Sequence, residues 1–159
     1  MQRSSPAASW GAVLGVTGLL NLGNAAWMLA DPPGWYHGLP AGVPHTGPLN
    51  EHFVRDIGAT FAVMGAALLW AAARPAARVP LLAMVTLFYL LHAAIHVYDT
   101  LRGLLPASHW SLDFPGVYLP ALLLLAMLAV LARQAKGEGP CEFHPSRSPR
   151  DSSRASPTG

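Results

Sequence analysis

Apolar residues gather in four long stretches of the chain, at about residues 10–30, 54–73, 79–98 and 114–132. A helix needs about 20 mostly apolar residues to cross a bilayer, and each stretch reaches that length. A soluble bundle would need a polar outer face on each helix, and the fourth stretch, LPALLLLAMLAVLA, is apolar all round. The pattern predicts an all-α fold, a four-transmembrane-helix bundle that runs up-down-up-down.

The composition supports a location in lipid. Hydrophobic residues make up 52% of the chain and charged residues only 11%, whereas a soluble domain carries about 25% charged residues. Residues 137–159 differ, because they are rich in Ser, Pro, Gly and Arg and cannot bury enough apolar area to fold alone. We therefore expect a transmembrane domain over residues 1–136 and a disordered basic tail over residues 137–159.

Positive charges in the short loops predict the orientation in the membrane. Arg3, Arg74, Arg78, Arg133 and Lys136 fall on one side if the chain crosses four times, and the opposite side holds two arginines beside five acidic residues. The side richer in Lys and Arg faces the cytoplasm. Both termini, including the tail, are therefore expected in the cytoplasm, with the chain in a bacterial inner membrane.

Small residues at intervals of four predict that the first two helices touch, because such faces let membrane helices approach closely. They are Gly11, Gly15 and Gly23 in the first helix, and Gly58, Ala62 and Ala66 in the second. Asn21 and Asn24 are expected to hydrogen-bond across helices. These asparagines also interrupt the first apolar stretch, which argues against its alternative interpretation as a cleaved signal peptide.

The segment between the first two helices, residues 31–53, is long for a bundle connection, which usually has about 2–8 residues. It is crowded with Pro and Gly, and its Trp35 and Tyr36 are typical of interfacial anchors. Such a segment is either a lid or binding loop, or a structured cap over the bundle.

Ionisable residues concentrate at the extracytoplasmic end of the predicted bundle. His52 and Asp56 are four residues apart at the start of the second helix, with Arg55 beside them. His92, His96 and Asp99 follow i, i+4, i+7 spacing at the end of the third helix, which places them on one stripe. If the two helices are antiparallel neighbours, the six residues form one polar cluster.

Three functions fit such a cluster, since ionisable groups within membrane spans usually pair or serve a function. The first is a structural clamp, in which Arg55 pairs with Asp99 or Asp56. The second is a site for zinc, copper or iron, because imidazole and carboxylate groups suit these ions. Its ligands would come from His92, His96, Asp99, His52 and Asp56.

The third is a b-type haem held by histidines of facing helices, with Arg55 or Arg102 near its propionates. A proton relay through His and Asp is a variant of the same idea. No nucleophile constellation indicates an enzyme, and the sparse basic tail does not indicate binding to nucleic acid. Asp113, before Phe114 and Pro115, is expected to be the N-cap of the fourth helix.

The layout resembles the DoxX-like small four-helix membrane proteins of bacteria. The resemblance lies in the DPPGW loop after the first span, the RDIG opening of the second helix and the turn at Arg74 and Pro75, and it covers residues from about Trp10 to Arg133. It implies the same four-span fold and allows a role in membrane quinol-oxidising or redox systems, but it assigns no catalytic residue.

The sequence therefore predicts a small integral membrane protein whose polar cluster is structural or ligand-binding. The alternative is a metal- or haem-binding redox subunit of a membrane complex. The expected partners are the lipid bilayer and either a second copy of the chain or another protein of a membrane complex.

Overall fold

The computed structural model describes residues 6–137, a range that forms helices and connecting turns without any strand. Four helices are long and apolar enough to cross a membrane. They are α1 (Pro6–Ala30), α3 (Glu51–Ala73), α4 (Arg78–Leu101) and α6 (Leu119–Gly137). The prediction of an all-helical protein with four such spans is confirmed, and each predicted boundary lies within four residues of the observed span. Apart from Gly137, the predicted tail lies outside the described residues.

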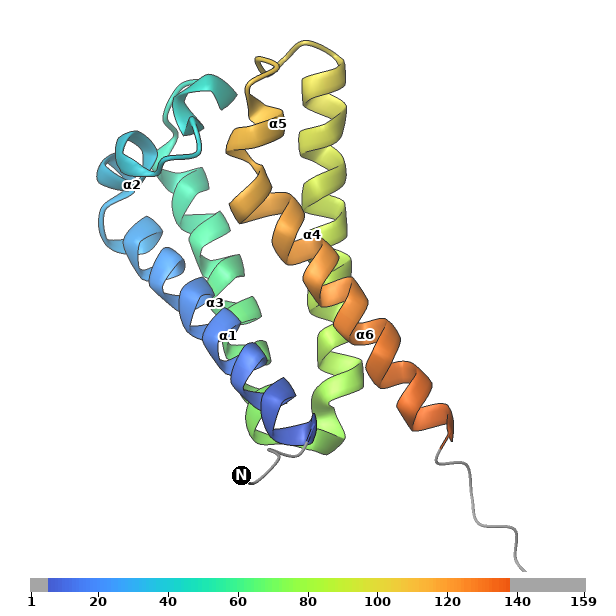
Figure 1. The fold of residues 1–159 in the computed structure, drawn as a ribbon. Coiled ribbons are helices and arrows are strands. Elements are labelled where there is room, and N and C mark those ends of the chain that lie inside the picture. The colour runs from blue at the N-terminus through green and yellow to red at the C-terminus, as the bar shows by residue number, and fades with distance from the viewer. Residues whose placement is uncertain (1–5, 138–159) are drawn as a thin grey trace, which may run out of the picture.

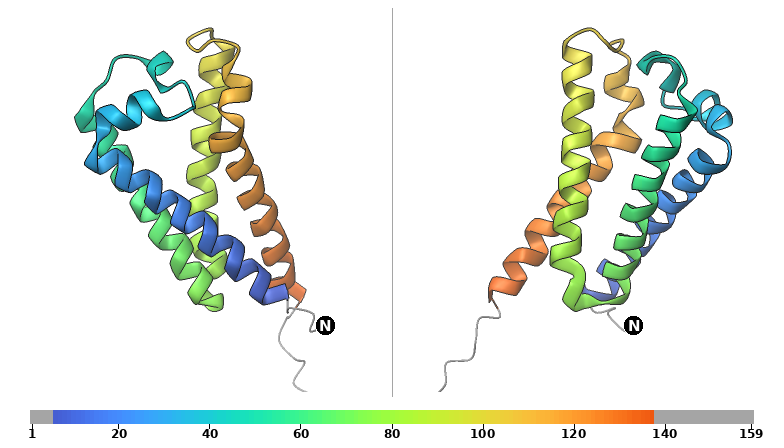
Figure 2. Two further views of the ribbon diagram at one scale, coloured as in Figure 1. Left: turned by 60° about the vertical axis from the view of Figure 1, so that its left-hand side comes forward. Right: turned by 180° about the vertical axis from the view of Figure 1, so that it is seen from behind.

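The helices are arranged as two pairs that share one apolar core. α1 lies alongside α3, and α4 packs against both α3 and α6 (Figures 1 and 2). The short helix η2 (Pro75–Ala77) joins α3 to α4 at the same end of the bundle as the start of α1. All four long helices contribute to the core, which consists of Leu14, Leu68, Ala71, Leu82, Val85, Tyr89, Ala121, Leu124 and Met127.

Small residues do bring α1 and α3 together, but they repeat every seven residues rather than every four. A Cβ atom built on Gly65 would lie 2.9 Å from the carbonyl oxygen of Gly18, and one on Gly58 would lie 2.9 Å from the Cβ of Met28. Gly15 and Gly23, which were expected in this contact, have nothing within 4 Å of such an atom. The observed seam consists of Gly11, Gly18 and Ala25 opposite Ala72, Gly65 and Gly58, respectively.

Asparagine side chains of α1 link the helices, as predicted. The hydroxyl of Tyr89 in α4 donates to Oδ1 of Asn21 at 2.7 Å, and both side chains are buried. The indole N–H of Trp35 donates to Oδ1 of Asn24 at 2.9 Å. Polar side chains can stabilise helix contacts in lipid, where an unpaired polar group is costly.

The turn between α3 and α4 is held by a buried arginine. Arg78 is only 8% exposed. Its Nε atom donates to the backbone oxygen of Ala71 at 3.0 Å and its Nη2 atom to that of Ala72 at 3.1 Å. These are carbonyls of the last turn of α3, which lack partners within the helix, and a cation there also interacts favourably with the helix dipole.

We expect Gly65→Ala to lower the free energy of unfolding by about 1–3 kcal/mol, because the new methyl group would meet the backbone of Gly18. The control is Gly23→Ala, which adds the same atom where nothing lies within 4 Å. It is expected to be neutral or to stabilise by up to about 1 kcal/mol through helix propensity. Thermal unfolding in mild detergent measures both, and equal effects of the two substitutions would contradict the seam.

Candidate functional site

The segment between α1 and α3 is a folded unit, which we call the connector (residues 31–50). It contains α2 (Pro32–Gly38) and the 3-10 helix η1 (Val43–Thr46). The side chain of Asp31 accepts the N–H of Gly34 and caps α2, while Gly42 at φ 64° turns the chain into η1. The connector is therefore structured, as the second sequence-based alternative predicts, and a structured connector is compatible with binding as well.

Tyr36 ties the two halves of the connector together. Its hydroxyl donates to the backbone oxygen of Gly47 at 2.6 Å, and its side chain is buried. The hydrogen bond and the burial hold Tyr36 within the connector, and its role as an interfacial anchor stays a prediction. Packing within the connector decides its position, which the composition of the loop alone does not reveal.

Asp113 stands where the chain enters the last long helix. It follows α5 (His109–Leu112) and precedes a π-helical turn, η3 (Phe114–Tyr118), whose Val117 N–H donates to the Asp113 carbonyl at 2.8 Å. The predicted N-cap position and early proline are observed, but the carboxylate of Asp113 makes no capping bond. Single π-helical turns are frequent at functional sites.

The carboxylate of Asp113 instead binds two histidines. Oδ2 lies 2.7 Å from Nδ1 of His96 in α4, and Oδ1 lies 3.1 Å from Nδ1 of His109. Nε2 of His109 lies in turn 3.1 Å from Nδ1 of His45 in η1. We call His45, His96, His109 and Asp113 the Asp113 cluster. It joins the connector, α4 and the entrance to α6.

Burial makes this cluster energetically important. Asp113 is 2% exposed and His109 is 0% exposed. An ionised carboxylate can only accept hydrogen bonds, so His96 and His109 each donate from Nδ1. In its neutral form, His109 then accepts at Nε2, and His45 donates from Nδ1. This arrangement satisfies every contact, with two imidazole N–H groups donating to the carboxylate and that of His45 donating to His109.

His92 extends the cluster into the membrane-spanning part of α4. Its ring lies edge-on to that of His96, with centroids 4.7 Å apart. It also stacks on Phe88 with centroids 5.9 Å apart and meets Phe61 of α3 edge-on at 6.2 Å. The predicted stripe of His92 and His96 therefore faces other side chains of the bundle, with aromatic rings on one side and Asp113 on the other.

The polar residues of α3 do not take part in this cluster. His52 lies 3.5 Å from Asp56, but the two side chains are 88% and 63% exposed. Arg55 pairs with Glu51 at 3.0 Å, in place of the expected Asp56 or Asp99. The backbone oxygen of Asp99 accepts the N–H of Leu104 at 2.9 Å, in the turn that follows α4. The predicted cluster is thus divided, because the charged side of the first turn of α3 is directed to solvent.

Residues 6–137 contain no group of three or more His, Cys, Asp or Glu side chains arranged to hold a metal ion. The proposed ligand set of His92, His96, Asp99, His52 and Asp56 is not assembled, so it does not fit zinc, copper or iron. No contact places Arg55 or Arg102 beside a histidine pair. Arg55 binds Glu51, and Arg102 lies over the ring of Tyr98, 5.7 Å from its centroid.

No protein-family model, curated protein or solved structure matches the chain. Four helices that are apolar enough to cross a membrane are compatible with a small membrane protein. The geometry of the Asp113 cluster and its surroundings is the basis for a more specific role of this chain.

The sequence analysis identified His96, and the sequence carried a signal for two further members of the cluster. His109 and Asp113 are four residues apart, which is the same spacing that drew attention to His52 and Asp56. The interpretation of Asp113 as an N-cap obscured it. His45 carried no local signal, since it meets His109 across 64 residues of sequence.

We expect Asp113→Ala to lower the free energy of unfolding by about 1–3 kcal/mol, because it leaves Nδ1 of His96 and Nδ1 of His109 without an acceptor in a buried site. Asp56→Ala is the matched control. It removes an exposed carboxylate that also faces a histidine, and it should change stability by less than about 0.5 kcal/mol. Unfolding in mild detergent distinguishes the two. If Asp113→Ala were as mild as Asp56→Ala, the cluster would have no structural importance.

Proposed function

We propose that this chain is an integral membrane protein of a bacterial inner membrane whose Asp113 cluster acts as a structural clamp. It crosses the bilayer up-down-up-down, with both termini in the cytoplasm and the connector on the extracytoplasmic side. The same four-span layout is what the resemblance of the sequence to DoxX-like proteins implies. The observation that carries the clamp is the carboxylate of Asp113, which is 2% exposed and binds His96 and His109.

The positions of the clamp residues along the chain support this role. His45 comes from the connector, His96 from the end of α4, and His109 and Asp113 from the entrance to the last helix. A single buried carboxylate thus fixes the end of α4 to the entrance of α6, and through His109 it holds the connector, which is far from both in sequence. Leaving such a charge partly unpaired is costly, so each segment is held in place by the bonds of the others.

The distribution of arginines supports the proposed sidedness. Arg74 and Arg78 lie in the turn at η2, at the end of the bundle opposite the connector. Positive residues in short loops favour the cytoplasmic side. The clamp would then face the extracytoplasmic space, and the η2 turn the cytoplasm.

Sidedness can be measured with single cysteines in a Cys141→Ser background. We expect Ala107→Cys, beside α5, to react with a membrane-impermeant thiol reagent on intact cells. Ala76→Cys, in η2, should react only after the membrane is opened. Both positions are exposed, so burial does not explain a difference. Labelling of Ala76→Cys alone in intact cells would reverse the proposed orientation.

The clamp itself is tested by His45→Ala, which frees η1 from His109. We expect the backbone N–H groups of the connector, including that of His45 to the Gly42 oxygen, to exchange with deuterium faster, while exchange in α4 and α6 stays the same. His52→Ala is the control, because it removes a histidine that is 88% exposed. Equal exchange in the connector of both variants would rule out the clamp.

A further inference from the structure

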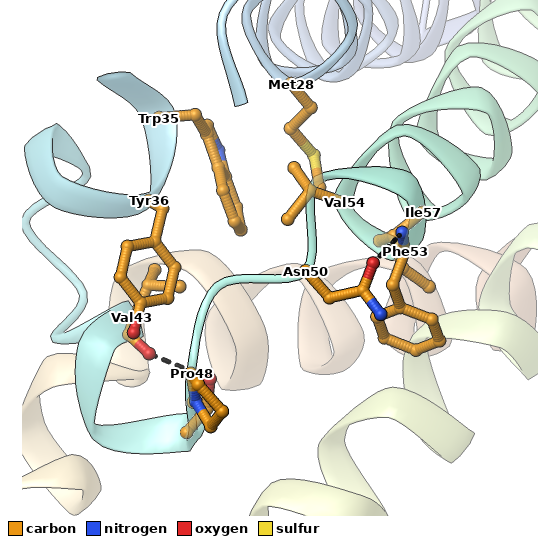
Figure 3. A pocket seen from close by; sticks show the side chains of 10 residues that line it. Met28, Trp35, Tyr36, Val43, Pro48, Asn50, Phe53, Val54 and Ile57 are labelled. Atoms are coloured by element: carbon orange, nitrogen blue, oxygen red, sulfur yellow. Dashed lines mark hydrogen bonds between the residues drawn. The ribbon is translucent and has the colours of Figure 1, made fainter. Parts of the chain in front are cut away.

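The connector and the ends of α1 and α3 line a half-open pocket of about 210 Å³. In Figure 3, Trp35 and Tyr36 of α2 lie on one side of it, and Met28 of α1 with Val54 and Ile57 of α3 on the other. Phe53 and Asn50 line the same pocket at the start of α3. Aromatic and aliphatic side chains therefore form most of its wall.

The polar side chains around this pocket already have partners. The indole N–H of Trp35 is bound to Asn24, and the hydroxyl of Tyr36 to the backbone of Gly47. Oδ1 of Asn50 accepts the backbone N–H of Phe53 at 3.1 Å. A polar ligand would have to compete with the bonds of Trp35 and Tyr36, and breaking the bond of Tyr36 would leave a buried hydroxyl unpaired. The pocket is thus suited to an apolar group, recognised by shape and contact.

We propose that the pocket binds a hydrocarbon segment of a membrane lipid. It lies where the spans of α1 and α3 end, at Ala30 and Glu51. Apolar side chains beside it are exposed, with Trp27 39%, Leu29 41% and Phe53 62% exposed. Under the proposed function these side chains face the extracytoplasmic leaflet. The proposal rests on that function, because only a protein in the bilayer has lipid chains next to this pocket.

The size of the pocket agrees with part of a chain. Pockets for drug-sized molecules measure about 300–1,000 Å³, and this one is smaller at about 210 Å³. An apolar cavity of about 150 Å³ is enough to bind benzene. The pocket would therefore hold several methylene groups of one acyl chain, with the rest of the lipid remaining in the bilayer.

The clamp and the pocket share one wall. Val43 and Thr46 of η1 line the pocket, and His45 between them binds His109. The Asp113 cluster therefore holds η1 in the position where it lines the pocket. Loss of the contact between His45 and His109 would loosen this wall, while the opposite side of the pocket, formed by Met28 and Val54, would stay the same.

Quenching by brominated acyl chains tests the proposal, because bromine quenches tryptophan on contact. The probe is the full chain with Trp35 as its single tryptophan, the other four being replaced by Phe, in vesicles of brominated phosphatidylcholine. We expect about a twofold loss of Trp35 emission relative to unbrominated vesicles, since a bound chain would lie within contact distance of the indole. Val54→Phe, which fills the pocket, should restore most of this emission.

Val63→Phe is the control, since it adds the same group on α3 at a position that is 62% exposed. It should leave the quenching unchanged. If Val54→Phe does not fold, Ile57→Ala enlarges the pocket and should increase the quenching instead. Unquenched Trp35, or quenching that these pocket substitutions do not alter, would overturn the proposal.

A second variant, with Trp70 as its single tryptophan, distinguishes failure of the lipid-pocket proposal from failure of the proposed membrane location. Trp70 is 60% exposed on α3 and should be quenched wherever the chain spans a bilayer. Quenching of Trp70 without quenching of Trp35 would reject the lipid pocket and keep the membrane protein. Loss of quenching at both positions would reject the membrane location and the lipid proposal together.

Discussion

The end of the bundle that carries the connector is organised around one buried negative charge. Moving a carboxylate out of water costs several kcal/mol, and only well-placed donors offset that cost. Asp113 meets this condition through Nδ1 of His96 and Nδ1 of His109, and His45 supports the second of them. The position of α5, the π-helical turn after it and the seating of η1 all depend on these bonds. Elsewhere the bundle relies on close packing of apolar and small side chains, together with the buried hydrogen bonds of Asn21 and Arg78.

The four long apolar helices could be predicted because their signal is local. Apolar runs of about 20 residues leave few alternatives, and the asparagines of α1 could be expected to seek partners across helices. The small-residue seam was predicted between the correct helices but with the wrong spacing, because Gly and Ala are common in this chain. Only the contacts of Gly18 and Gly65 distinguish the residues that pack from those that face outward.

The candidate site was harder to predict, for a physical reason. Residues on one helix face can be found by their spacing, which correctly grouped His92 with His96. Which faces meet depends on the rotation of each helix about its axis, and the sequence does not state that rotation. Arg55 and Asp56 were expected to face α4, yet they lie at the exposed surface of α3. The histidines of α4 instead meet the segment that leads into α6.

The seven-residue spacing of the seam also determines where residues could be inserted without changing how α1 packs against α3. Gly11, Gly18 and Ala25 of α1 oppose Ala72, Gly65 and Gly58 of α3, so the two helices have one register along their whole contact. An extra residue between two seam positions would rotate every later side chain of the helix by about 100°, and it would place a bulky residue against the opposite backbone. Extra residues in the connector between α2 and η1 would leave that register intact. The pair of α1 and α3 thus behaves as a fixed frame, whose register does not depend on the length of the connector.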